Sequence, residues 1–233
     1  MHNIIAFIIT LCAAILWLRI INFFAHKKWI SSGLSRKIIH IGTGPIFIIC
    51  WLLFDNQINA RFLAVLIPLA ITLQFFMVGA GIIKDESAVK AMSRTGDRKE
   101  ILRGPLYYGI IFVCLTIIFW HDTPIGITAL MLMCGGDGIA DILGRRYGKI
   151  KIPWNQQKSW VGSICMFIGG WILTVLIFWI YLLANNFSGV ILNYLFPISI
   201  IALGCTIVES LPLKDIDNIT ITIAAVILGY LFL

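Results

Sequence analysis

Long apolar runs recur along the whole chain, and they restrict it to folds that a lipid bilayer can solvate. Sixty per cent of the 233 residues are hydrophobic and only 12% are charged, roughly half the charged fraction of a soluble domain. In the hydrocarbon core of a bilayer, backbone N–H and C=O groups must hydrogen-bond to one another. These runs are long enough to do so as membrane-spanning helices. We therefore predict an all-α, polytopic transmembrane helical bundle of about eight spans, with seven as the alternative count. The expected spans are residues 4–25, 38–54, 60–83, 106–121, 124–144, 161–184, 188–208 and 217–233.

The length suits one compact unit, so residues 1–233 are expected to form a single integral membrane domain. No basic segment precedes the first apolar run, and Arg19 interrupts it, which favours a transmembrane helix over a cleaved signal peptide. The six cysteines are scattered singly through apolar stretches, so neither a disulfide framework nor a zinc site is expected. The net charge of +7 is attributed to membrane topology and an anionic ligand, and not to nucleic acid.

Basic residues alternate between the predicted loops. All but two of the 18 Lys and Arg residues lie in the loops after the first, third, fifth and seventh spans. Loops rich in Lys and Arg normally face the cytoplasm. We therefore expect an active site on the cytoplasmic face and both termini on the opposite side. The polar residues within or at the ends of the spans fall in the same leaflet, and they are His40, Asp137, Asp141, Ser163, Glu209, Asp217 and Asn218.

The most informative segment is the run of small and acidic residues from Gly135 to Asp141. Asp137 and Asp141 are four residues apart, so in a helix they share one face and repel each other unless a cation lies between them. Mg²⁺ prefers oxygen ligands and often binds one or two carboxylates together with substrate phosphates. The glycines allow a break in the helix, as in membrane helices that line a cavity. The alternative is a packing seam of small residues in which one aspartate caps a helix.

A cluster of cations and small polar residues follows this segment. Positive charge beside a carboxylate pair suits a polyphosphate bridged by Mg²⁺, and the start of a helix adds donors for an anion. The alternative is ordinary positive-inside charge or attraction to anionic lipid. Neither the P-loop nor the G-x-G-x-x-G motif of soluble nucleotide-binding folds occurs. The residues of the cluster are Arg145, Arg146, Lys149, Lys158, Ser159, Gly162 and Ser163.

His40 follows Arg36 by four residues, a spacing that would place both on one helical face. A histidine there is able to orient a phosphate or accept a proton. A structural histidine at the membrane interface is an equally good explanation from this segment alone. Glu209 and Asp217, at the ends of the last two spans, are the other candidates for a proton acceptor.

Five blocks, taken in order, resemble the phytol kinase branch of the CTP-dependent polyprenol kinase family. This family includes phytol, farnesol and dolichol kinases and a CTP-dependent diacylglycerol kinase. The resemblance covers most of the chain after the first span. The blocks are Arg36-Lys37…His40, Arg94-x-Gly96-Asp97…Glu100…Gly104-Pro105-Leu106-Tyr107-Tyr108, Gly136-Asp137-Gly138-x-Ala140-Asp141…Gly144-Arg145-Arg146…Gly148-Lys149, Lys158-Ser159-Trp160-x-Gly162-Ser163, and Glu209-Ser210-Leu211-Pro212…Asp217-Asn218-x-Thr220.

The resemblance implies transfer of the CTP γ-phosphate to a long isoprenoid alcohol, most simply phytol, on the way to tocopherol synthesis. Asp137 and Asp141 would hold Mg²⁺, and His40, Glu209 or Asp217 would accept the proton. No nucleic acid partner is expected. The residues assigned to binding phosphate or nucleotide are Arg36, Lys37, Arg145, Arg146, Lys149, Lys158, Ser159, Gly162, Ser163 and Asn218.

Three other functions fit part of the pattern. A phosphatidate cytidylyltransferase shares the Asp…Gly-Arg…Gly-Lys…Lys-Ser-Trp-x-Gly-Ser pattern, but its later signature is absent, and Lys214-Asp215 is a poor substitute. A CTP-dependent diacylglycerol kinase would differ in its acceptor. A transporter or lipid-binding protein would explain buried polar residues but not the five blocks.

Overall fold

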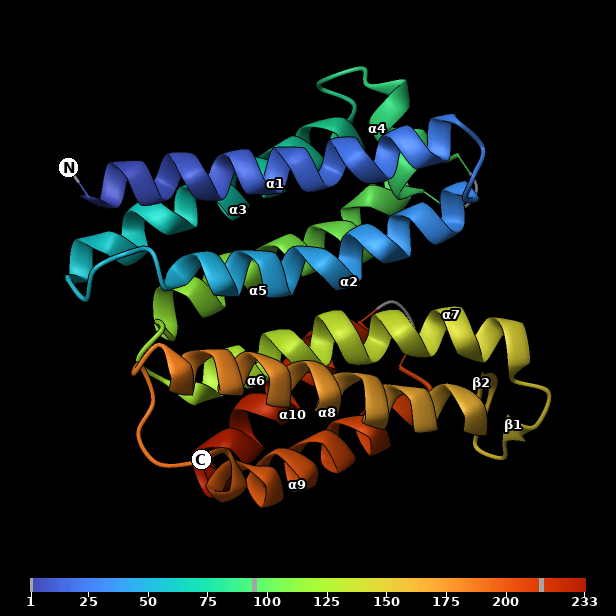
Figure 1. The fold of residues 1–233 in the computed structure, drawn as a ribbon. Coiled ribbons are helices and arrows are strands. Elements are labelled where there is room, and N and C mark those ends of the chain that lie inside the picture. Colours follow the sequence, from blue (N-terminus) through green and yellow to red (C-terminus); the bar gives the residue numbers. More distant parts are fainter. Residues whose placement is uncertain (1, 94–95, 214–215) are drawn as a thin grey trace.

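The computed structural model describes residues 2–93, 96–213 and 216–233, so Arg94, Lys214 and Asp215 of the sequence analysis lie outside the described residues. Helices make up most of it, as predicted (Figure 1). The first half contains α1 (His2–His26), α2 (Ser32–Trp51), α3 (Ile58–Ala80), α4 (Glu86–Met92), the 3₁₀ helix η1 (Arg98–Leu102) and α5 (Gly104–Ile118). The second half contains α6 (Pro124–Met131), the π-helix η2 (Leu132–Asp137), α7 (Gly138–Tyr147), β1 (Lys151–Ile152), β2 (Asn155–Ser159), α8 (Trp160–Leu183), α9 (Ile191–Ser210) and α10 (Asp217–Phe232).

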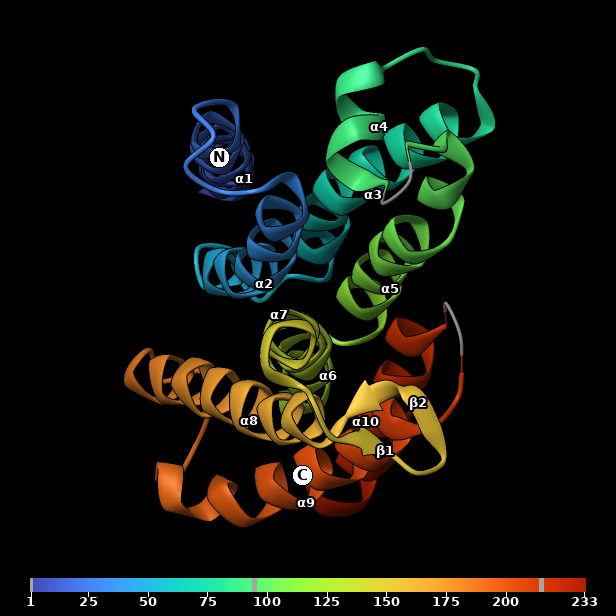
Figure 2. The same cartoon turned by 90° about the vertical axis from the view of Figure 1, so that its right-hand side faces the viewer.

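The helices form two layers that follow the order of the chain. Helices α1 to α5 make one layer and α6 to α10 make the other, and the two views agree on this division (Figures 1 and 2). Both termini lie at one end of the bundle, while the α1–α2 connection and the β1–β2 hairpin lie at the other end (Figure 1). The predicted eight membrane crossings, an even number, would place both termini on the same side in this way.

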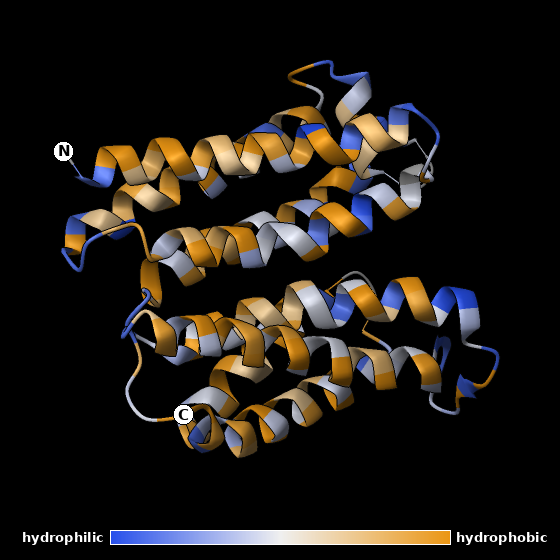
Figure 3. Ribbon diagram, viewed as in Figure 1, coloured by the Kyte–Doolittle hydropathy of each residue, from blue (hydrophilic) through white to orange (hydrophobic). Residues whose placement is uncertain are grey.

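Six helical segments of the described chain are long and apolar enough to cross a membrane. Two further helices complete the predicted set of eight: α10 has only 16 residues, and α2 carries Arg36, Lys37 and His40. Hydrophobic residues cover the lengths of the helices, and hydrophilic residues gather mainly at their ends (Figure 3). The prediction of an all-α polytopic bundle is confirmed, with six spans meeting the length and hydropathy criteria outright.

The segment from Pro124 to Tyr147 runs through the centre of the bundle. Its residues from Gly126 to Gly138 are all buried. The expected break at the glycines is instead a continuous helix whose middle turn, η2, is π-helical. Added Cβ atoms would collide with α8, at 2.2 Å from Leu173 for Gly135 and 2.6 Å from Met166 for Gly136. The glycines therefore let two helices approach, and π-turns of this kind are frequent at functional sites.

Three local features differ from the prediction. Helix α2 begins at Ser32 rather than residue 38, because the Ser31 side chain accepts a hydrogen bond from the Leu34 amide and caps it. The loop between α7 and α8 contains an antiparallel hairpin, which the sequence did not predict. The loop between α3 and α5 contains α4 and η1, each started by an aspartate whose side chain accepts a backbone hydrogen bond.

Candidate active site

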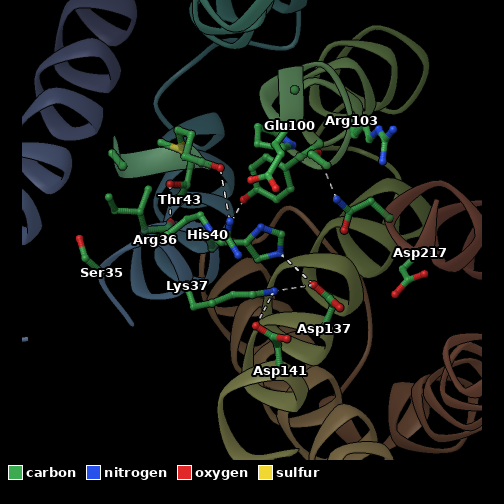
Figure 4. A pocket seen from close by; sticks show the side chains of 18 of the residues that line it. Ser35, Arg36, Lys37, His40, Thr43, Glu100, Arg103, Asp137, Asp141 and Asp217 are labelled. Carbon is green, nitrogen blue, oxygen red and sulfur yellow. Dashed lines mark hydrogen bonds and ion pairs between the residues drawn. The ribbon is translucent and has the colours of Figure 1, made fainter. Parts of the chain in front are cut away.

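A cavity of about 1540 Å³ lies between the two layers and receives side chains from both of them. Its polar part is shown in Figure 4. The structure brings together most of the predicted site residues, although they come from five separate segments of the sequence. Those that line the cavity are Arg36, Lys37, His40, Asp137, Asp141, Arg145, Lys158, Ser159, Gly162, Ser163, Glu209, Asp217 and Asn218.

The cation between the two aspartates is a lysine of the chain itself. The Nζ atom of Lys37 lies 3.3 Å from Oδ2 of Asp137 and 3.4 Å from Oδ2 of Asp141 (Figure 4). All three side chains are largely buried, with exposed fractions of 11%, 13% and 21%. Helix α2 thus supplies the positive charge that the i, i+4 carboxylates of the central helix require.

His40 stands one turn after Lys37 on α2 and faces the same carboxylate. Its Nε2 atom lies 3.2 Å from the Met133 carbonyl oxygen and 3.6 Å from Oδ2 of Asp137. Both neighbours are acceptors only, so Nε2 carries a proton in this arrangement. The Tyr108 ring lies 4.3 Å from the imidazole, and its hydroxyl donates to the His40 carbonyl at 2.8 Å. Tyr108 therefore fixes the position of this histidine.

A second ion cluster surrounds Lys158 at the end of the hairpin. Its ammonium group bonds to Oε1 of Glu209, and it lies 2.8 Å from Oδ2 of Asp217. Burial alone lowers the pKa of Lys158, but the carboxylates of Glu209 and Asp217 raise it more, so this pKa lies above its ordinary value. Lys158 is therefore a permanent cation that ties the hairpin to α9 and α10.

Three carboxylates converge beside this lysine. One oxygen each from Asp137, Glu209 and Asp217 lies within 4.8 Å of the others. Glu209 is buried, and its Oε2 atom has no hydrogen-bond partner among the described residues. A buried carboxylate oxygen without a partner is costly unless a ligand satisfies it. Oxygen donors of this kind suit Mg²⁺.

Asp141 is placed differently from these three carboxylates. Its Oδ1 atom accepts from Nε of Arg145 at 2.6 Å, and its Oδ2 atom faces Lys37. Both oxygens are thus engaged by cations. Two of the predicted phosphate ligands lie outside the cavity lining: Arg146 stacks on the Tyr147 ring at 5.3 Å, and Lys149 is exposed. Their binding of phosphate stays a prediction.

The small polar residues at the start of α8 divide by role. Ser159 caps the helix, because its Oγ atom accepts from the Gly162 amide at 3.1 Å. Gly162 packs against Gly144 of α7, and an added Cβ at Gly144 would lie 3.1 Å from the Gly162 Cα atom. Ser163 is buried, and its Oγ atom has no hydrogen-bond partner in the described part of the chain. Ser163 is therefore the member of this group with a donor available to a ligand.

Several lining residues were not predicted as site residues. Tyr108, Glu100 and Arg103 lie within the second of the five sequence blocks. Their positions in that block could have identified them as site residues. Asn155 had no such signal. Its side-chain amide donates to the carbonyls of Ser210 and Leu211, at 3.2 and 3.1 Å, and so fixes the hairpin against the end of α9.

Known proteins with similar sequences support the family that these blocks suggested. A rice protein named "Probable phytol kinase 1, chloroplastic" is 41% identical over 207 residues, covering 88% of this chain and 66% of the rice protein. Phytol kinase 1 of Arabidopsis thaliana is 37% identical over 210 residues, covering 88% and 68%. This chain belongs to the phytol kinase branch of the prenol kinase family. Farnesol kinase of the same plant is 39% identical over 205 residues, covering 85% and 65%.

The predicted family is therefore confirmed, and its named members are kinases of isoprenoid alcohols. This chain spans about two thirds of the length of these prenol kinases, which are named as chloroplastic. No protein-family model matches the chain, and no solved structure matches it.

Proposed function

We propose that this chain is a membrane kinase that transfers the γ-phosphate of CTP to the hydroxyl of a long isoprenoid alcohol, phytol first among them. The observation that carries the proposal is a single cavity that joins a charged cluster to an apolar wall, in a chain related to phytol and farnesol kinases. A polyphosphate needs the first part of this cavity, and a hydrocarbon chain needs the second. In this role the chain would supply phytyl phosphate for tocopherol synthesis.

Phosphoryl transfer depends mainly on positioning and on stabilising negative charge. Cations from both layers face the cavity, and we assign the phosphates of CTP to them. Lys37 and Lys158 are each held by two carboxylates, so a triphosphate would compete with those carboxylates for the ammonium groups. The proposed phosphate ligands on the cavity wall are Arg36, Lys37, Arg145, Lys158, Ser163 and Asn218.

A divalent cation fits the acidic side of the cavity. Asp137, Glu209 and Asp217 bring oxygens within 4.8 Å of one another, and Oε2 of Glu209 lacks a protein partner among the described residues. We propose that these three side chains hold Mg²⁺, with Asp137 shared between this set and the pair Asp137 and Asp141. When bound, the ion would neutralise charge on the transferred phosphate. Asp141 would then serve mainly to position Lys37 and Arg145.

The acceptor hydroxyl is assigned to the surroundings of His40. His40 and Tyr108 both line the cavity, where the charged cluster meets the apolar wall. Because Nε2 of His40 is already protonated toward Asp137 and Met133, Nδ1 is the imidazole atom that would accept the alcohol proton. Glu209 and Asp217 are the alternative acceptors, but both are bonded to Lys158.

The charged end of the bundle is proposed to face the cytoplasm. The α1–α2 connection and the loops that contain α4 and the hairpin hold most of the basic residues, which favours that side. CTP reaches the cavity from that compartment, and the alcohol reaches it from the bilayer.

The test is a product assay with purified protein in detergent or vesicles. CTP and Mg²⁺ are supplied with phytol, farnesol, dolichol, diacylglycerol or phosphatidate, and CTP is also replaced by ATP, GTP and UTP. We expect CDP and phytyl phosphate in equal amounts. Release of pyrophosphate with phosphatidate would instead identify a cytidylyltransferase, and faster turnover of diacylglycerol than of phytol would identify the other kinase branch. Absence of turnover with every pair would favour a transporter or lipid-binding protein.

A further inference from the structure

The cavity does not end at the charged cluster. It continues between α1, α2, α3 and α5, where its lining is mostly apolar and includes Ala14, Trp17, Ile46, Phe47, Ile71 and Phe112. The polar lining residues Asn22, His26 and Gln74 lie toward the C-terminal ends of α1 and α3. Phe47 lies seven residues after His40 on α2, so this arm extends about 10 Å along that helix from the charged cluster. Helix α1 stands beside α2 (Figure 2), and residues of α1, α2 and α3 all line the arm.

One wall of the arm is a file of aromatic rings that begins at His40. The Tyr108 ring lies 4.3 Å from the imidazole, the Phe112 ring 4.8 Å from Tyr108, and the Phe47 ring 5.8 Å from Phe112. Centroid separations of this size are typical of interacting ring pairs, so the row of rings is continuous. A hydrocarbon chain lying along it would have its polar end at the histidine.

The threonine hydroxyl groups of the arm have no donor free to hydrogen-bond to a polar ligand. Thr10 donates to the Ala6 carbonyl at 2.7 Å, and Thr43 donates to the Ile39 carbonyl at 2.6 Å. Each hydroxyl is thus used within its own helix. The Trp17 indole, which lies against the Gly42 backbone, directs its N–H to the Ile39 carbonyl at 3.4 Å. The arm therefore suits a saturated or isoprenoid chain and not a sugar or a nucleobase.

We infer that the arm between α1, α2, α3 and α5 holds the hydrocarbon tail of the acceptor alcohol and sets the tail length that the enzyme accepts. This inference rests on the proposed kinase function. It assigns α1, which lies outside the five sequence blocks, to substrate selection. In this arrangement the charged cluster binds the phosphate groups, and helices of the first layer bind the tail and select its length.

Two adjacent alanines of α1 provide a matched test. Ala14 lines the arm, whereas Ala13 does not. Ala14→Phe should fill the arm and lower kcat/KM for phytol, a C20 alcohol, by about tenfold or more relative to geraniol, a C10 alcohol whose tail stops short. Ala13→Phe should leave the ratio of the two kcat/KM values unchanged. An unchanged ratio in active Ala14→Phe protein would overturn the inference.

A labelling experiment on the unmodified protein covers the case in which Ala14→Phe does not fold. A phytol analogue with a diazirine at the far end of its tail is photolysed with the protein, and the labelled peptides are identified. We expect labelling within residues 2–26 that excess phytol abolishes. Labelling of α2, α3 or α5 beside the arm would agree with the inference, and labelling confined to α6 to α10 would place the tail elsewhere. If the wild type phosphorylates neither phytol nor geraniol, the proposed function fails, and this result is distinct from either outcome for the arm.

Discussion

Lys37 shows how a single residue determines the chemistry of this site. The sequence predicted Mg²⁺ between Asp137 and Asp141, with Lys37 as a phosphate ligand, whereas the structure places the Lys37 ammonium itself 3.3 and 3.4 Å from the two carboxylates. Asp141 also pairs with Arg145, so two cations balance the two carboxylates. The lysine therefore belongs to the stability of the fold as well as to the proposed binding of phosphate.

Replacing Lys37 by Met should leave two close carboxylates without their shared ammonium group. We expect a loss of about 3 kcal/mol in the free energy of unfolding, because one partner of a buried ion group is removed. Adding Asp141→Asn should recover part of this loss, since only one carboxylate then remains uncompensated. Melting temperatures in detergent measure both effects, with the exposed Lys84→Met as control. Strict additivity of the two substitutions would contradict the shared ion pair.

The Mg²⁺ dependence of the rate distinguishes between the two possible sets of metal ligands. If Asp137, Glu209 and Asp217 hold the ion, Glu209→Gln should raise the Mg²⁺ concentration for half-maximal rate by tenfold or more, since even outer-shell changes cost roughly 10–100-fold. Asp141→Asn should lower kcat and leave that concentration nearly unchanged. The exposed Glu86→Gln is the control. The reverse pattern would return the ion to the pair Asp137 and Asp141.

At the scale of elements, the contact of α7 with α8 depends on two glycines. The distance from an added Cβ at Gly144 to the Gly162 Cα atom is only 3.1 Å, and backbone cannot move aside as a flexible side chain does. This contact joins the segment that carries Asp137 to the helix that carries Ser163. The hairpin between them is fixed by the two hydrogen bonds from Asn155.

Gly144→Ala should therefore separate α7 from α8 and lower the free energy of unfolding by about 1–3 kcal/mol, the usual cost of overpacking. Gly33→Ala, in α2, is the matched control, because nothing lies within 4 Å of an added Cβ there. The measurement is the melting temperature of each variant in the same detergent. Equal melting temperatures for the two variants would show that the contact is not tight.

Sequence reasoning found most of these elements, and two of the differences have clear physical causes. Helix α2 was predicted to begin at residue 38 because Arg36 and Lys37 looked like loop charges. In the structure both residues line the cavity from inside a helix. The π-helical turn was predicted as a break, since glycines permit either. Helix packing against α8, which periodicity does not reveal, decides between them.

At the scale of the whole molecule, the arrangement of the termini and the charged cavity predicts one topology. Lys149 lies in the loop between α7 and the hairpin, and Ser188 lies in the connection between α8 and α9, at the other end of the bundle. In intact cells an impermeant thiol reagent should label Ser188→Cys and should not label Lys149→Cys. Unmodified protein gives the background. Labelling of Lys149→Cys from outside would reverse the proposed orientation and remove the route for CTP from the cytoplasm.

The sequence by itself determined the membrane class, the order of the helices, the charged face and the family, because these follow from local hydropathy, charge and motif order. Only the tertiary structure decided the pairings. Lys37 meets Asp137 across 100 positions of the chain, and Lys158 meets Glu209 across 51. The tertiary structure also placed Arg146 and Lys149 outside the cavity lining, and it formed an apolar arm of the cavity beside α1. Such contacts depend on how helices pack, and the spacing of residues along one helix carries no information about its neighbours.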